Sequence, residues 1–134
     1  MKINEIERTI ITEALSDLLL YIQKSVPHLR NTSAENLTAN TMAISTAKIK
    51  LSRIVEDPEQ KFTLMELKVM YWALRELSAN TRDFLDSASL SDPDRNTAFE
   101  TEKTCNHLLR FFRDQFEKAG VSPPDELLPH WSSY

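Results

Sequence analysis

The side chains that could act as metal ligands, nucleophiles or proton carriers are three histidines and one cysteine: His28, His107, His130 and Cys105. Common zinc sites need paired Cys or His residues at short spacing, and di-iron bundles need a Glu-x-x-His motif on each of two helices. The chain contains neither spacing. The pattern therefore predicts no metal site and no catalytic residue among these side chains.

His28 could also serve in one further reaction, the transfer of a phosphoryl group. Helical phosphotransfer proteins carry an exposed histidine in the middle of a helix. His28 instead follows Pro27 and precedes a polar run, which is typical of a turn. We interpret His28 as a turn residue, His107 as part of a polar helix face and His130 as part of the tail, with phosphotransfer retained as an alternative.

Cys105 falls on the apolar face of its predicted helix, where a cysteine is usually a small buried side chain and not a reactive thiolate. A single cysteine excludes an internal disulfide and is typical of a reducing compartment. The only glycine, Gly120, excludes the phosphate-binding loop and the dinucleotide-binding fingerprint, because each needs several glycines. We therefore expect no cofactor and no small-molecule site, and an enzyme with an unrecognised site is the third interpretation.

Five apolar side chains stand where charged residues would be expected on a helix surface. Met65, Val69 and Trp72 lie together among the charges of the third predicted helix, and Met42 and Ile49 lie seven apart on the second. Because consecutive helices of a bundle run antiparallel, Ile49 and Trp72 should lie at similar heights and share one outward patch. The predicted partner-binding residues are Met42, Ile49, Met65, Val69, Trp72 and Arg75.

Two other interpretations of Trp72 remain open. The C-terminal segment carries Leu127, Leu128 and Trp131, which could fold back and cover Trp72 as part of the core. Alternatively, the apolar side chains are isolated on the surface and have no role, as is common in soluble proteins.

The chain carries a net charge of −4, which disfavours non-specific binding to nucleic acid or to acidic membranes. Two groups of basic residues nevertheless keep a nucleic-acid-associated regulator as the second interpretation: Lys48, Lys50 and Arg53, and then Arg95, Lys103, Arg110 and Arg113. Acidic residues alternate with the second group, so no continuous positive stripe results.

Apolar periodicity and capping residues predict four long helices. Their expected ranges are 3–26, 32–56, 62–90 and 91–118. Thr63 and Glu66 form a capping box at the start of the third helix, where each side chain satisfies a backbone amide that the helix leaves open. Pro93 should occupy the first position of the fourth helix, and Gly120 should follow its end.

Short connections between these helices predict an all-α fold, an antiparallel up-down-up-down four-helix bundle. We expect residues 1–120 to form the bundle and residues 121–134 to form a short tail docked on it. The apolar side chains of the first helix, from Ile3 to Val26, cover more than half of its circumference. A stripe of that width needs two neighbouring helices, or a second copy of the chain, to bury it.

These features predict a non-catalytic helical protein–protein interaction module: an adaptor, an inhibitor or immunity-type protein, or a dimeric regulator. Its partner is another protein or a second copy of the chain. Glu5, Glu7 and Arg8 interrupt any signal-peptide-like run, and no stretch is apolar enough to span a membrane. We therefore expect a cytoplasmic protein that inserts in no membrane.

Overall fold

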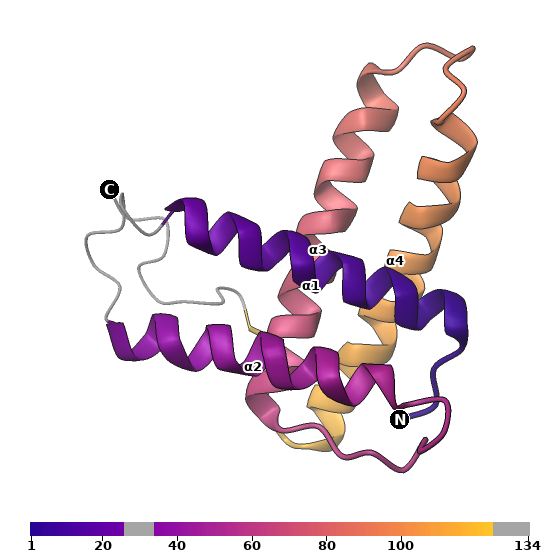
Figure 1. The fold of residues 1–134 in the computed structure, drawn as a ribbon. Helices are drawn as coiled ribbons and strands as arrows, with labels where there is room; N and C mark the ends of the chain where they lie inside the picture. The colour runs from indigo at the N-terminus through magenta and orange to yellow at the C-terminus, as the bar shows by residue number, and fades with distance from the viewer. Residues whose placement is uncertain (26–33, 125–134) are drawn as a thin grey trace.

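The computed structural model describes residues 1–25 and 34–124, and within them it contains four helices and no strand (Figure 1). The helices are α1 (Glu5–Ser25), α2 (Ala34–Ser52), α3 (Leu64–Ser87) and α4 (Arg95–Lys118). They pack against one another around a shared apolar core. The prediction of an all-α four-helix bundle is confirmed.

The four helices form two antiparallel pairs that cross each other. Figure 1 shows α1 and α2 side by side in one layer, and α3 and α4 as a hairpin that runs across them in a second layer. Helix α3 contacts all three other helices, and its most extensive contact is with α4. Among the four described helices, only the backbones of α2 and α4 do not approach each other closely. Helix α3 is therefore the centre of the fold.

The core lies where the two pairs cross. Its largest fully buried side chains come from all four helices and include Leu15, Ile44, Leu74, Phe112 and Phe116. Each such side chain stabilises the fold by about 1.5–3 kcal/mol relative to an exposed position. As predicted, α1 packs against two other helices, α2 and α3, with a smaller contact to α4.

Reciprocal capping fixes the start of two helices. The Thr63 hydroxyl accepts a hydrogen bond from the Glu66 amide at 3.1 Å, and the Glu66 carboxylate accepts one from the Thr63 amide at 2.7 Å, so the predicted capping box is confirmed. Asn4 and Glu7 make the same exchange at the start of α1, which the sequence analysis missed. Two amides that a helix start leaves without a helical partner are satisfied in each case.

Two predicted helix ends are wrong by about one turn. Helix α2 ends at Ser52, because the amides of Arg53 and Ile54 bond carbonyls three residues back in tighter turns. Val55, beyond the end of the helix, is exposed. Helix α4 begins at Arg95, so Pro93 precedes the helix. The Asp92 side chain accepts a hydrogen bond from the Asp94 amide and holds a turn at that point.

The end of α4 is a Schellman motif centred on Gly120. The Val121 amide donates to the Phe116 carbonyl and the Gly120 amide to the Glu117 carbonyl, both at 3.0 Å. Gly120 has a φ of 71°, in the left-handed region that side chains disfavour. A Cβ atom at Gly120 would meet no other atom within 4 Å, so only the backbone conformation opposes a side chain there.

We expect Gly120→Ala to lower the free energy of unfolding by about 1 kcal/mol, the cost of left-handed backbone for alanine. Urea denaturation followed by circular dichroism measures the loss. Gly120→Asn is the matched control, because asparagine tolerates this conformation and should cost less than alanine. Equal losses in both variants, or none in Gly120→Ala, would contradict the assignment.

The outer half of the α3–α4 hairpin projects beyond α1 (Figure 1). Residues 79–104, which we call the outer arm, contain no buried side chain. The two helices of the outer arm cover each other only in part, and α1 borders only the inner end of the arm, beside Thr101 and Thr104 of α4. This half of the hairpin is therefore held mainly by contacts between α3 and α4.

None of the helices in the described part of the chain combines the length and the apolar character that a membrane crossing requires.

Candidate functional site

The junction between α2 and α3 is organised by a buried ion pair. Lys50 Nζ lies 2.7 Å from Glu66 Oε1, and the Glu66 side chain is only 2% exposed. Lys50 also donates to the Lys61 carbonyl at 2.9 Å and lies 5.7 Å from the centre of the Phe62 ring. One ammonium group therefore joins the end of α2, the connecting segment and the first turn of α3.

Burial and hydrogen bonding act on the Glu66 carboxylate in opposite directions. Burial raises its pKa, whereas hydrogen bonds from Lys50, Thr46 and the Thr63 amide, together with the charge of Lys50, lower it. The lowering contributions prevail, so the pKa lies below the ordinary value of 4.5. Because the folded pKa is the lower one, ionised Glu66 contributes stability above pH 4.5, and this contribution is lost as the pH falls through the folded pKa.

We expect Lys50→Met to reduce the free energy of unfolding by about 3 kcal/mol at neutral pH, because it leaves a buried carboxylate without its cation. Glu66→Gln should cost less, about 1–2 kcal/mol, because the Lys50 side chain is 28% exposed and its ammonium can reach water. Urea denaturation of both single variants and the double variant measures the coupling between the two side chains.

The pH dependence provides the control for this double-mutant cycle. In wild type the Glu66 carboxyl becomes protonated only as the pH falls through its folded pKa, which lies below 4.5, and the cost of Lys50→Met should shrink over that range. If the loss of unfolding free energy in the double variant equals the sum of the two single losses, or if the losses do not change with pH, the two side chains are not energetically coupled.

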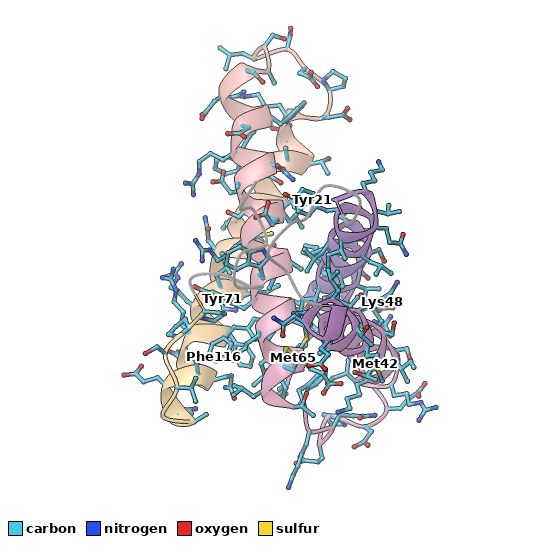
Figure 2. The ribbon with its side chains drawn as sticks, turned by 90° about the vertical axis from the view of Figure 1, so that its left-hand side faces the viewer. Tyr21, Met42, Lys48, Met65, Tyr71 and Phe116 are labelled. Carbon is cyan, nitrogen blue, oxygen red and sulfur yellow. The ribbon has the colours of Figure 1, made fainter. Side chains whose placement is uncertain are left out.

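The structure places the predicted partner-binding residues of α2 and the start of α3 at the surface. Met42 is 62% exposed, Ile49 is 55% exposed and Met65 is 38% exposed. Figure 2 labels Met42 on α2 and Met65 near the beginning of α3. At 100° per residue, Met42 and Ile49 lie almost opposite the centre of the buried face of α2. That they form one continuous surface with the α3 residues stays a prediction.

The prediction for Val69 is wrong, because its side chain is fully buried at 0% exposure. The sequence pattern places Val69 among charged residues, but α3 contacts three helices and therefore buries a wider arc of its surface. Val69 lies between Glu66 and Ala73, one turn away from each, and all three are buried. It belongs to the core and not to a partner-binding surface.

Trp72 and Arg75 are brought together. The Arg75 guanidinium lies 5.0 Å from the centre of the Trp72 ring and 6.0 Å from that of Tyr71. Arg75 Nη1 also donates to the Pro124 carbonyl at 3.4 Å, so the segment after α4 returns to α3. Trp72 is half-buried against the core. Leu127, Leu128 and Trp131, which could cover Trp72, lie outside the described residues.

The neighbouring Tyr71 is held by α4. Arg113 Nε donates to the Tyr71 hydroxyl at 2.9 Å, and the Tyr71 ring meets Phe116 edge to face with centres 5.6 Å apart. Figure 2 shows Tyr71 and Phe116 between α3 and α4. Buried tyrosines need such a hydroxyl partner, so this contact fixes the α3 segment that carries Trp72 and Arg75.

Cys105 is fully buried on the core side of α4, as predicted. Burial, together with the nearby negative charge of Glu102, raises the pKa of its thiol to about 11. The group is therefore a neutral thiol at physiological pH, and a neutral thiol is a poor nucleophile.

We expect native Cys105 not to react with a disulfide reagent such as DTNB at mildly alkaline pH, because the thiol is both neutral and inaccessible. The same protein unfolded in guanidinium chloride, which serves as the control, should react at once. Rapid labelling of the native protein would show that α4 opens readily around this position.

The remaining candidates for chemistry do not form a cluster. His107 Nε2 lies 3.6 Å from a Glu7 carboxylate oxygen at the protein surface. His28 and His130 lie outside the described residues. Where the structure does describe side chains, it brings no three His, Cys, Asp or Glu residues together in a way that could hold a metal ion.

Several of the basic residues weighed for nucleic-acid binding make contacts within the chain. Lys48 donates to the Ser16 hydroxyl at 2.8 Å, Lys50 pairs with Glu66, and Arg95 donates to two carbonyls at the end of α3. Arg113 is bound to Tyr71. These contacts weaken the nucleic-acid interpretation, because phosphate binding needs cations that are free to face a partner.

Comparisons of the chain with protein-family models, with curated proteins and with solved structures find no match.

Proposed function

We propose that the chain is a non-catalytic protein-binding module. The observation that carries the proposal is the exposure of large apolar side chains on α2 and in the first turn of α3; α3 also carries an arginine that lies over the ring of a tryptophan. We call this surface the α2–α3 patch and define it by Met42, Ile49, Met65, Trp72 and Arg75. Its partner is another protein or a second copy of the chain, and we place this activity in the cytoplasm.

The composition of the α2–α3 patch supports this function. Methionine, tryptophan and arginine are enriched at protein interfaces, and flexible methionine side chains adapt to the surface of a partner. Leu64, which the sequence analysis left out, is also exposed beside Met65. The aromatic ring of Trp72 with Arg75 above it resembles the central anchors that dominate binding energy in many interfaces.

A photo-crosslinking amino acid at position 42 or 65 tests the proposal in the native cell. We expect a discrete cross-linked species from both positions, and none from position 59, where the exposed Glu59 lies outside the patch. Light scattering of the purified protein then decides between a second copy and a different protein, since the chain alone is 15.5 kDa.

The matched variants Met42→Gln and Met65→Gln remove the apolar anchors without adding charge. Each variant should lower the apparent affinity for the partner about tenfold. The loss should appear as a weaker cross-linked species or, if the partner is a second copy, as a lower mass in solution. If both variants keep the cross-links and the mass of wild type, the α2–α3 patch binds nothing and the proposed function is wrong.

A further inference from the structure

A second surface lies in the corner where α1 crosses the α3–α4 hairpin. Three adjoining hollows follow this corner, and we call them together the crossing groove. The first lies between α1 and α3, the second between the two helices of the outer arm, and the third between α1 and α4. Asn80 borders the first and second hollows, and Thr97 and Thr101 border the second and third. The three hollows therefore adjoin one another along the corner.

The crossing groove is lined by apolar side chains that the fold leaves partly uncovered. On α1 these include Ile6, which is 70% exposed, and Tyr21, which lies at the inner side of the corner in Figure 2. On the hairpin they include Leu77, Phe84 and Ala98. The α1 residues belong to the wide apolar stripe that the sequence predicts for this helix. The hairpin residues belong to the face of the hairpin that borders this corner.

Every charged side chain that lines the crossing groove is acidic. The four are Asp17, Glu76, Asp94 and Glu100, and no lysine or arginine lines any of the three hollows. None of the four carboxylates forms an ion pair with another residue in the described ranges 1–25 and 34–124. The groove therefore combines an apolar floor with uncompensated negative charge.

The two arginines of the outer arm do not neutralise this charge. Arg95 is directed to the carbonyls of Leu85 and Ala88, where it caps the end of α3. Arg82 Nε lies 2.9 Å from Glu102 and pairs with it. Over residues 79–104 the sequence has three bases and six acids, so the outer arm carries much of the net charge of the whole chain.

The dimensions of the crossing groove suit a helix. Ile6 and Tyr21 are 15 positions apart on one face of α1, a distance of about 22 Å at 1.5 Å per residue. A bound helix of about 15 residues would span this length with apolar side chains at every third or fourth position. Lysine or arginine on its flanks would meet the four carboxylates.

A second copy of the chain fits this surface less well. In a twofold dimer the same patch faces itself, so the acidic lining of one crossing groove would meet the acidic lining of the other. Like charges facing each other in this way oppose association. Charge complementarity instead favours a basic partner.

We propose that the crossing groove binds a basic amphipathic helix of a partner protein. Its apolar face contacts Ile6, Phe84 and their neighbours, and its basic residues pair with Asp17, Glu76, Asp94 and Glu100. The surface shares no residue with the α2–α3 patch, so each can be tested and can fail without the other.

Fluorescence anisotropy with a labelled leucine–lysine helix of about 15 residues tests the proposal on the full chain. We expect saturable binding that weakens as salt is added, because exposed charge pairs are screened. Ile6→Gln should weaken binding about tenfold by removing an exposed anchor, and the double variant Asp17→Lys, Glu100→Lys should do the same by reversing charge. All three positions are exposed, so these variants should fold as wild type does.

Matched controls distinguish peptide binding in the crossing groove from non-specific attraction between the peptide and the protein surface. Val55→Gln removes an exposed apolar side chain outside both surfaces, and the double variant Glu56→Lys, Glu59→Lys changes the net charge by the same amount outside the groove. Both should bind as wild type does. A peptide with the same leucines but glutamate in place of lysine should not bind.

Three results would overturn the proposal. The first is no binding of the basic peptide at millimolar concentration, and the second is an equal loss in groove and control variants, which would indicate non-specific charge attraction. The third is a dimer in light scattering that Ile6→Gln converts to a monomer, because the groove would then belong to a second copy.

Discussion

Helices α1 and α2 cross the α3–α4 hairpin instead of running along it, and the rest of the structure follows from that crossing. Two crossed pairs share a core only near the point of contact. There α3 is surrounded by three helices and buries side chains as polar as Glu66 and Ser78. Beyond the crossing, the same two helices continue into solvent with no third helix to cover them. The crossing thus produces both a dense core and the corner between α1 and the outer arm.

The local features of the sequence predicted the elements well. Four helices, the capping box of Thr63 and Glu66, the glycine that ends α4 and the core position of Cys105 all depend on residues close together in the chain. The end of α2 and the start of α4 were predicted less accurately, because competing turns at Arg53 and Asp92 depend on a few local hydrogen bonds. No periodic pattern distinguishes such a turn from one more turn of helix.

The candidate sites could be predicted only in part. Met42, Ile49 and Met65 are exposed as expected, because an apolar residue opposite the core face of a helix has little else to contact. Val69 was assigned to the surface because the number of neighbours around α3 cannot be read from α3 itself. The Lys50–Glu66 pair and the crossing groove depend on how the two helix pairs meet, and the sequence pattern carries no direct signal for that angle.

The absence of buried side chains in the outer arm has a consequence for motion. The free energy needed to open a backbone hydrogen bond follows the packing around it, so amide hydrogens near Leu74 and Phe112 should exchange with solvent only when the whole domain unfolds. Those of residues 79–104 can exchange through local opening of the hairpin end. The chain therefore joins a slowly exchanging core to an arm of low local stability, and any ligand that orders the arm gives up part of its binding energy to do so.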